Sequence, residues 1–594
     1  GGTTINQGTL VVNPGSSIPK AFDTAKGLVL NDATFVQTFA GAIHPDNIVT
    51  LNGGSSITYF GDNTQAGVKF DNQGGVNVPT VKTFNAGTAG TLTLSGFTTL
   101  NGLTAIEAAS ANVGTTSVIE GRVDFGSTLK LVDVASIDVN GSTDVSPLQA
   151  ALALQAVVGT TGGIRKIGDG VLQFNAQSLF TGQVDVFGGG VKTGYTNAGS
   201  RFANLNLGAN TRFDLNGYST AWGSLSGYGD VFSSSGTPTL TVGLDGTDTV
   251  FSGRLIRFND AAYAHLTKVG GGEMTFDVAQ DGDGSFGAIT VSGGSLKYSG
   301  AGAAFVSSST ENTVFNVLTG SVLALDNSGT NVSDRLGAAI GGTVNILGGT
   351  LALNGKSAAN SSESIANLTL ATGAGRIELT PNGANQLTLS VTNLAAPGAG
   401  SLVISGLAGT AELAVSNANL VAGQGSSGTA LAVRGDILVS ASVNGLGEGF
   451  LADDAGIWRA LASGDLNFDA ATWESQQNAG LSGASTLGIS ASVNTLTIDG
   501  ATASLASGLA SGFGRYGVDG SAVTLTLANA SAVLVKSGTV EMDVALLGSA
   551  SQAPQFHVLD GAILNLNAGL GLGSSVGFVK SGGGTMNLKA LAGF

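Results

Sequence analysis

A nine-residue motif that occurs three times constrains the fold of this chain more than any other feature. The copies begin at Lys166, Lys268 and Lys580 and share the form Lys-x-Gly-x-Gly-x-(Leu/Met)-x-(Phe/Leu). The two glycines suit a tight corner, because glycine adopts backbone conformations that other residues avoid. The two final apolar residues are two positions apart, so they lie on one face of the strand that follows. A repeated corner and strand predicts a solenoid, in which each coil buries its apolar face against the next.

The rest of the chain shows the same pattern in a looser form. Short runs that alternate polar and apolar residues recur, as in Thr91–Leu94, Thr239–Val242 and Leu496–Asp499. Most of them are bounded by Gly, Asn, Ser or Pro, as strands between turns are. Asn-Gly pairs, which supply positive φ at corners, begin at Asn52, Asn101, Asn140, Asn216, Asn354, Asn382 and Asn444. The pattern therefore predicts an all-β chain with one elongated architecture and short loop inserts.

We expect three sections of this architecture and one helix. Residues 1–163 form an N-terminal solenoid section, 164–300 the section with the first two motif copies, and 301–594 a C-terminal section that ends in a half repeat. Ser146 as N-cap and Pro147 at the first helical position predict a short helix near 147–157.

The motif copies extend into longer units. The second copy continues to the run Phe286–Leu296, and the first continues from Phe180 to Val191; both continuations contain consecutive glycines. This arrangement resembles the autotransporter-associated β-strand repeat, which reads roughly Leu-x-Lys-x-Gly-x-Gly-Thr-Leu-x-Leu, then an aromatic residue, then Gly-Gly-x-Thr. The clear matches cover only a small part of the chain. The resemblance implies a right-handed parallel β-helix and a secreted passenger domain of a Gram-negative-type bacterium.

Composition limits the location and the partners. Charged residues make up 11% of the chain, against about 25% in an average soluble domain. The net charge of −16 argues against nucleic acid as a partner, because nucleic-acid binding needs a basic face. No run of 18 or more apolar residues occurs, so we expect no transmembrane segment. The absence of cysteine suits export of an unfolded chain, and the predicted location is extracellular, at a bacterial cell surface.

The two ends of the sequence resemble the two halves of one repeat. Phe594 follows Lys580 by 14 residues, as Phe180 follows Lys166. Placed after Phe594, the first residues match the run after Phe286 without a gap, and Thr4 then falls on Thr290. This match predicts an assembly junction between a C-terminus and an N-terminus, formed by Gly1, Gly2, Thr3, Thr4, Ile5, Leu10, Lys580, Gly582, Gly584, Met586, Leu588 and Phe594. Separate chains stacked end on end, tandem copies in one longer polypeptide, and an arbitrary fragment of a repetitive protein all remain open.

Residues with catalytic or metal-binding chemistry are sparse. His44, His265 and His557 are isolated in the sequence, so neither a zinc site nor a catalytic triad is indicated. The glycine runs after Lys268 and Lys580 open strands instead of helices, which fits turns better than phosphate loops. No cofactor is expected. The acidic turns Asp245–Asp248, Asp281–Gly284 and Asp453–Asp454 fit solvated turns better than the alternative, weak calcium sites. Core packing is the preferred interpretation of Trp458 and Trp473, with a sugar-contacting patch as the alternative, and Trp222 is interpreted as an ordinary solenoid residue.

These observations favour a structural protein over an enzyme. The leading hypothesis is a subunit of an extracellular filament or surface layer that propagates head to tail as a homopolymer by completing the split repeat. The alternative is a monomeric adhesin passenger that binds surface or matrix glycans, which should show a side cleft lined with aromatic residues. A polysaccharide-cleaving β-helix enzyme would need converging carboxylates, and the acidic residues are mostly scattered singly.

Overall fold

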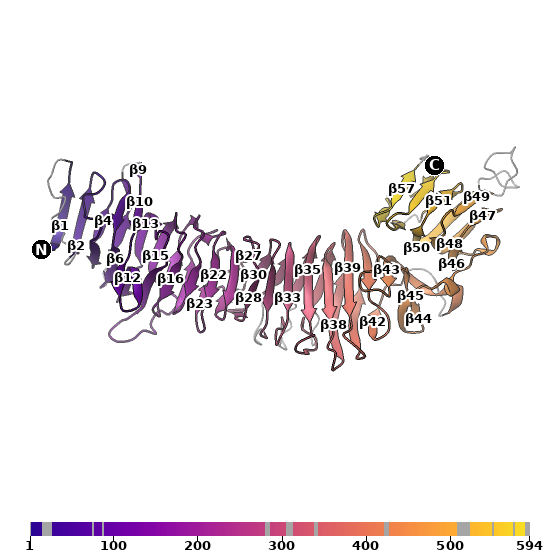
Figure 1. Ribbon diagram of the computed structural model, residues 1–594, viewed down its shortest axis with the longest axis horizontal. Helices are drawn as coiled ribbons and strands as arrows, with labels where there is room; N and C mark the ends of the chain where they lie inside the picture. The colour runs from indigo at the N-terminus through magenta and orange to yellow at the C-terminus, as the bar shows by residue number, and fades with distance from the viewer. Residues whose placement is uncertain are drawn as a thin grey trace. The chain divides into compact units, whose positions relative to one another are not determined.

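The computed structural model describes residues 2–14, 27–73, 77–85, 88–279, 286–304, 313–337, 342–420, 427–507, 523–548, 552–573 and 576–588. These residues contain β-strands and only short 3₁₀ turns, η1 (Gly428–Ala430), η2 (Ser463–Asp465) and η3 (Ala470–Thr472). The chain divides into two compact units within β32 (Ala288–Val291), and the first unit contains Gly1–Ile289. Figure 1 shows the strands of each unit stacked side by side. The predicted section 164–300 contains this division.

The first unit is built on two long parallel ladders, in which each strand pairs with a strand of the next coil. The first ladder runs β1 (Thr3–Val12), β2 (Leu28–Gln37), β3 (Ile48–Asn52), β6 (Gly67–Asn72), β12 (Gly102–Ser110), β14 (Lys130–Ile137), β16 (Ile164–Ile167), β19 (Val184–Val186), β22 (Asn204–Leu207), β25 (Ser224–Gly227), β28 (Thr249–Phe251) and β31 (Glu273–Phe276). The second begins at β2 and continues through β4 (Ser56–Thr58), β7 (Thr80–Lys82), β13 (Ser117–Asp124), β15 (Ala150–Val157), β17 (Val171–Phe174), β20 (Gly190–Thr193), β23 (Arg212–Asp214), β26 (Asp230–Phe232) and β29 (Arg254–Leu255).

Shorter strands complete the coils of the first unit. They are β5 (Asn63–Gln65), β8 (Phe84–Asn85), β9 (Thr88–Ala89), β10 (Thr91–Leu94), β11 (Phe97–Thr99), β18 (Gln177–Ser178), β21 (Gly199–Ser200), β24 (Thr220–Ala221), β27 (Thr239–Val242) and β30 (His265–Lys268). Among them β24, β27 and β30 form a further parallel ladder, whereas β8 with β9 and β11 with β12 are antiparallel.

The second unit contains two parallel stacks. The first stack consists of the ladder β33 (Gly294–Tyr298), β35 (Ser321–Asp326), β37 (Thr350–Asn354), β39 (Ala374–Thr380), β41 (Ser401–Ser405) and β43 (Ala432–Ser440), and of the ladder β34 (Val314–Leu318), β36 (Thr343–Leu347), β38 (Ser361–Thr369), β40 (Leu387–Leu394) and β42 (Ala411–Asn417). The antiparallel strands β44 (Gly449–Asp454) and β45 (Ile457–Ala460) follow β43.

The second stack follows η3. Its strands are β46 (Asn478–Leu481), β47 (Ala484–Leu487), β48 (Ala491–Asp499), β49 (Ser504–Ser507), β50 (Thr524–Ser537), β51 (Thr539–Met542), β52 (Ala545–Leu547), β53 (Gln555–Val558), β54 (Ile563–Leu566), β55 (Leu570–Gly571), β56 (Val579–Ser581) and β57 (Thr585–Leu588). All their pairings are parallel, and β56 and β57 continue the ladders through β53 and β54.

The core follows from the alternation in the sequence. Along β36 the burial alternates strictly, with Val344 and Ile346 buried between half-buried neighbours. Outward-facing asparagines form ladders between coils, as where the Asn345 amide donates to Asn316 at 2.8 Å. Apolar residues therefore fill the inside of each coil, and polar side chains bridge coils on the outside.

The length of a coil differs between the two units. In the first unit Asn204 lies opposite Ser224, 20 residues later. In the second unit Val322 lies opposite Thr350, 28 residues later. The all-β architecture with long parallel ladders was predicted correctly, as in a β-solenoid.

The helix predicted near 147–157 is wrong, because residues Ala150–Val157 form β15. This strand lies between β13 and β17, so its backbone groups are paired on both sides. Its first five residues are all buried, and a strand covered on both faces has a continuous apolar run in place of alternation. The helix start signal instead forms a turn, in which the Gln149 amide donates to the Ser146 carbonyl at 3.1 Å.

The Asn-Gly prediction is right at some corners only. Asn140 and Asn216 adopt positive φ, at 54° and 51°. At the pair that begins with Asn52 the glycine supplies it, with φ of 61° at Gly53. Neither residue has positive φ in the pairs that begin with Asn354 and Asn444.

Candidate assembly interface

Strand β1 carries the N-terminal half of the predicted junction. It pairs with β2 on one side, and among the described residues no strand pairs with its other side. Ile5 lies opposite Leu30 and Leu10 opposite Phe35. Leu30 and Phe35 are fully buried, whereas Ile5 and Leu10 are only half-buried. β1 therefore presents part of the apolar inner face to its surroundings.

The remaining N-terminal junction residues lie beside them. Thr3 is half-buried, and Gly2 and Thr4 are exposed. Gly1 and Phe594, which the junction prediction also includes, lie outside the described residues.

Strands β56 and β57 carry the C-terminal half. They pair with β53 and β54 on one side, and within the described ranges nothing pairs with their other side. Met586 lies opposite the buried Leu564, and Leu588 opposite the buried Leu566. Met586 is half-buried and Leu588 is 39% exposed, so this edge also presents inner-face side chains.

The corner between β56 and β57 contains Lys580, Gly582 and Gly584. The Lys580 side chain is exposed, and its ammonium donates to the main-chain carbonyl of Gly582. Gly582 has a φ of 77°. A Cβ atom there would lie 2.2 Å from the Val558 carbonyl oxygen, so only glycine fits this close approach of two coils.

The first motif copy forms a similar corner inside the first unit, with a different environment. Lys166 is fully buried on β16. Its ammonium donates to the carbonyl of Ile167 at 3.0 Å, to that of Gly188 at 2.9 Å, and to that of Gly168. Gly188 belongs to the next coil, two residues beyond Val186, which is the ladder partner of Lys166. Main-chain oxygens of two coils thus bind one buried cation.

The second copy also buries its lysine, and the carbonyl acceptors there belong to its own turn. The Lys268 ammonium is buried and donates to the carbonyls of Val269 at 2.8 Å and Gly272 at 2.7 Å. Burial lowers the pKa of both lysines, that of Lys166 to about 7, because the ammonium loses its water. Nearby carboxylates favour the protonated form and offset part of this loss, those of Asp133 and Asp169 at Lys166 and those of Asp245 and Asp248 at Lys268. The motif lysine is therefore a corner cation that replaces hydration with main-chain acceptors.

A serine–histidine pair in the second unit was not anticipated from the sequence. His557, on β53, is fully buried. Its Nε2 lies 2.7 Å from the Gly435 carbonyl oxygen, and its Nδ1 lies 2.6 Å from Ser581 Oγ. A carbonyl can only accept, so Nε2 carries the proton and Nδ1 accepts from the serine hydroxyl. Burial lowers the pKa of the His557 imidazole. Ser581 stands where the other motif copies have Ile167 and Val269, which is the only sequence signal for this pair.

This pair borders a cavity of about 210 Å³, whose lining also includes Arg376 and Asp560. The group that orients the histidine is a main-chain carbonyl, where a hydrolase triad uses a carboxylate. The arrangement satisfies a buried imidazole and joins β53 to β43.

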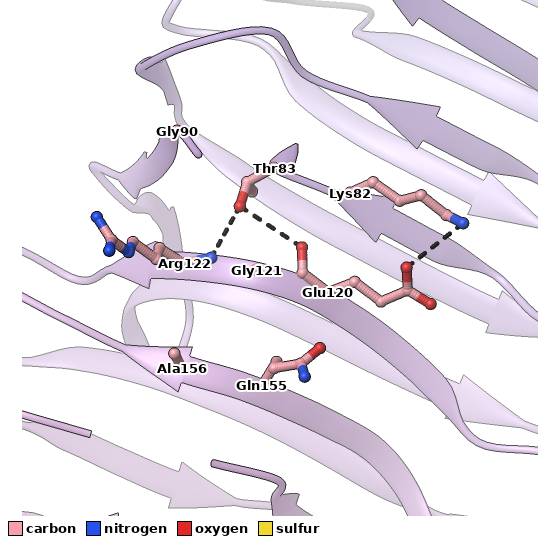
Figure 2. A pocket seen from close by; sticks show the side chains of 8 residues that line it. All are labelled: Lys82, Thr83, Gly90, Glu120, Gly121, Arg122, Gln155 and Ala156. Atoms are coloured by element: carbon pink, nitrogen blue, oxygen red, sulfur yellow. Dashed lines mark hydrogen bonds and ion pairs between the residues drawn. The ribbon is translucent and has the colours of Figure 1, made fainter. Parts of the chain in front are cut away.

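A larger cleft of about 600 Å³ lies in the first unit, where β13 bulges between Ile119 and Arg122. Figure 2 shows the Lys82 ammonium directed at the Glu120 carboxylate, 3.4 Å away. The Arg122 amide donates to Thr83 Oγ1 at 2.8 Å. The lining is Lys82, Thr83, Gly90, Glu120, Gly121, Arg122, Gln155 and Ala156. It differs from the aromatic cleft that the adhesin alternative predicts.

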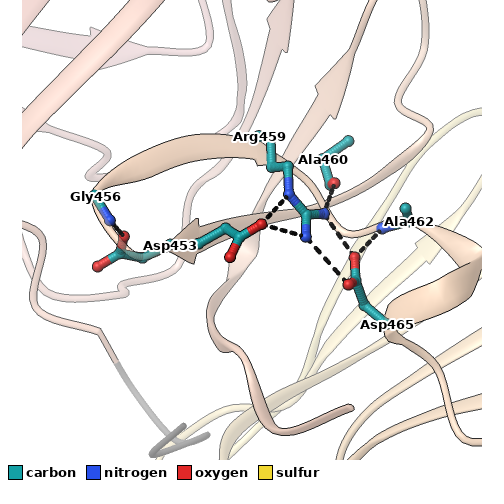
Figure 3. A network of polar contacts seen from close by, with 7 residues as sticks. Asp453, Gly456, Arg459, Ala460, Ala462 and Asp465 are labelled. Atoms are coloured by element: carbon teal, nitrogen blue, oxygen red, sulfur yellow. Dashed lines mark hydrogen bonds and ion pairs between the residues drawn. The ribbon is translucent and has the colours of Figure 1, made fainter. Parts of the chain in front are cut away.

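The acidic turns considered for calcium are engaged in internal contacts where they are described. Asp454 and Asp465 both bind the Arg459 guanidinium, which Figure 3 shows between two carboxylates. Hydrogen bonds from Arg459 lower the pKa of the Asp465 carboxyl. Asp453 accepts from the Gly456 amide at 2.7 Å.

In the other described turn, Asp245 accepts from Thr247 and from Ser224, and Asp248 accepts from the Glu273 amide at 2.7 Å. Asp281–Gly284 lie outside the described residues.

The three tryptophans are buried, as the core interpretation predicted for Trp458 and Trp473. Trp222 is buried and contacts the rings of Phe174, Phe180 and Phe213 edge-on. Trp458 and Trp473 are also buried, and the Trp473 indole donates to the Asn467 carbonyl at 2.9 Å.

Exposed aromatic residues occur elsewhere in the first unit. Tyr195 is 64% exposed and stacks with Tyr218 at a centroid distance of 6.2 Å. Phe187 and Tyr228 are exposed as well. They follow the ladder positions Val186 and Gly227, which are two coils apart.

No protein-family model matches the chain, and no curated protein and no solved structure matches it either. The helices in the described part of the chain are all too short to cross a bilayer.

Proposed function

We propose that this chain is a structural subunit of an extracellular bacterial filament or surface layer, of the autotransporter-repeat type and with right-handed parallel β-helix coils. In this proposal β56 and β57 of one copy pair with β1 of the next copy. The role is structural and not catalytic. The observation that carries the proposal is the match between the two edges.

The match can be stated as a register taken from the first motif copy. There, Lys166 pairs with Val186, Leu172 with Val191 and Phe174 with Thr193. With Ile5 placed at the position of Val186, the spacing within each strand pairs Lys580 with Ile5, Met586 with Leu10 and Leu588 with Val12.

Every one of these junction pairs joins two inner-face positions. Ile5, Leu10 and Val12 lie opposite buried residues of β2, and Met586 and Leu588 lie opposite buried residues of β54. Burying such side chains contributes about 25 cal/mol per Å² of apolar surface. A shift of one residue would turn the apolar side chains outward, so the register is specified by the pattern.

The outward-facing side chains of β57 and β1 are compatible with this pairing, since like charges on facing strands would oppose it. The exposed part of β57 carries Thr585 and Asn587, and β1 carries Thr4 and Asn6. None of these four side chains is charged, so none of them repels a facing strand.

Electron microscopy of the purified chain at rising concentration tests the proposal. We expect rods that lengthen with concentration and show an axial repeat of one subunit. Single short particles at every concentration would contradict self-assembly of separate chains. Alanine in place of Leu10 or Leu588 should shorten the rods, and alanine in place of the outward-facing Thr93 is the matched control.

The adhesin alternative is favoured by one observation, the exposed aromatic side chains of the first unit. Tyr195 with Tyr218, and Phe187 with Tyr228, present ring surface of the kind on which sugars stack. Glycan-array binding that is lost on replacing Tyr195 by alanine would support this alternative, and unchanged binding would count against it.

A further inference from the structure

The corner lysines suggest what recognises the next subunit at the proposed junction. In the first unit the Lys166 ammonium binds a carbonyl of its own turn and also the carbonyl of Gly188 in the following coil, 2.9 Å away. In this copy the motif therefore joins neighbouring coils through a cation and a main-chain oxygen. That contact depends on backbone geometry and needs no particular side chain in the receiving coil.

The same lysine at the edge of the second unit has only the first kind of contact. Lys580 donates to the Gly582 carbonyl within its own turn. In the described part of the chain, no carbonyl from another coil accepts from it. Lys580 is exposed where Lys166 and Lys268 are buried.

We infer that the Lys580 ammonium binds the main-chain carbonyl of Gln7 in the adjoining copy; this inference rests on the proposed head-to-tail assembly. The position follows from the register. Gly188 lies two residues beyond Val186, the ladder partner of Lys166. Gln7 lies two residues beyond Ile5, the partner assigned to Lys580.

The backbone of β1 suits this role. Four residues separate Ile5 from Leu10, as four separate Val186 from Val191. Both segments turn through a left-handed glycine, with φ of 79° at Gly8 and 59° at Gly189. Gln7 itself has a φ of 64°, whereas Gly188, at the same position of the first copy, has no positive φ. The two corners therefore share the left-handed glycine and differ in the conformation of the residue before it.

Contact with Gln7 would bring Lys580 into the environment of the internal lysines. The incoming coil would cover the ammonium and replace its water with a carbonyl oxygen. An ammonium covered without such an acceptor is costly, so a copy in the wrong register would be rejected. Lys580 therefore favours the correct strand register at the junction. The apolar contact comes from Ile5, Leu10, Met586 and Leu588.

The test compares three variants of the full chain by sedimentation and electron microscopy. Lys580→Met keeps the length and removes the charge, and we expect the concentration needed for assembly to rise about tenfold or more. Gln7→Gly keeps the carbonyl and suits the positive φ, so assembly should persist at the unchanged concentration. Lys536→Met serves as the control. Lys536 pairs with Asp499 on the surface of inner coils of the second stack, away from the proposed junction, so assembly should be unchanged.

The outcomes separate the two proposals. If the unmodified chain fails to assemble at any concentration, the proposed function is wrong and this inference falls with it. If the unmodified chain and Lys580→Met assemble equally well, only the inference is overturned. Loss of assembly in Gln7→Gly would show that the glutamine side chain is recognised, which also overturns it. A thermal unfolding curve for each variant, expected to match that of the unmodified chain, shows that the fold is intact.

Discussion

The corner at Lys166 and the segment around Arg434 both bury a cation, and they satisfy it in different ways. Lys166 lies among parallel coils, and main-chain carbonyls accept from its ammonium. Arg434 lies on β43, which is antiparallel to β44. Its guanidinium binds both oxygens of Asp436 at 2.8 Å, and both side chains have 0% exposure.

The difference indicates which kind of buried cation can occur in every coil of a repeat. Lys166 is bound by main-chain oxygens of the corner, and the Asp133 and Asp169 carboxylates favour its charge without a direct ion pair. Such an arrangement can recur wherever the corner recurs. A cation held by a carboxylate needs one specific partner, so it suits a place where the stacking changes. The pairing of β43 with β44 shifts its register between Arg434 and Leu438. In the same segment, the Gly435 carbonyl accepts a hydrogen bond from His557 of the second stack.

The largest effect is expected from Asp436→Ala. The substitution leaves the guanidinium of Arg434 buried without its carboxylate, and breaking such a pair costs about 3–5 kcal/mol. The double variant Arg434→Leu with Asp436→Leu is the matched control, because replacing both charges by apolar groups is often close to neutral. Denaturant unfolding of the second unit measures both. Equal destabilisation of the single and double variants would contradict this assignment.

A smaller effect is expected from Lys166→Met. Carbonyl oxygens of Ile167, Gly168 and Gly188 lose their donor, at a cost of about 1–3 kcal/mol. The loss should appear in the unfolding of the first unit. A variant as stable as the original chain would mean that these carbonyls need no cation.

The His557 imidazole should make the second unit sensitive to acid. Its folded pKa lies below the usual value of 6.5, so the folded form binds fewer protons than the unfolded form. The stabilisation is complete above about pH 6.5 and is lost as the pH falls through the folded pKa. His557→Gln should therefore flatten the change in stability between pH 7 and pH 5, at a cost of about 1 kcal/mol at pH 7 for the altered hydrogen bonds. If both proteins show the same pH dependence, His557 is not the responsible group.

The smallest effect on stability is expected from Lys580→Met. Its ammonium is exposed, so its removal should change the free energy of unfolding by less than about 0.5 kcal/mol. Measured below the assembly concentration, this contrasts directly with Lys166→Met. A large loss of stability would show that the two corners are equivalent within one chain.

Much of the fold could be predicted because the alternation and the corner glycines are local signals. Period-2 alternation marks strands such as β10, β27 and β36, since one face of each strand is buried. Residues Ala150–Val157 were misread because a strand buried on both faces has no alternation. The antiparallel strands β44 and β45 were also beyond prediction, because their partners are fixed by tertiary packing.

Prediction of the sites was less complete for a related reason. The motif identified Lys166, Lys268 and Lys580 as equivalent positions, but burial depends on the coil that covers each one. The pairs Arg434 with Asp436 and His557 with Ser581 needed the structure, because the second joins residues 24 positions apart and the first resembles any short charged run. Trp458 and Trp473 were placed in the core correctly, since a large aromatic side chain is most often buried by packing.

Hydrogen–deuterium exchange of the chain across the assembly concentration tests the central claim most directly. The ladder proposed between β57 and β1 would pair amides that no strand pairs with in the described part of a single chain. We predict that protection rises together in Thr3–Val12 and in Thr585–Leu588 as the concentration increases, while interior strands such as β16 stay unchanged. Protection that rises in neither segment, or in only one of them, would contradict head-to-tail completion of the repeat.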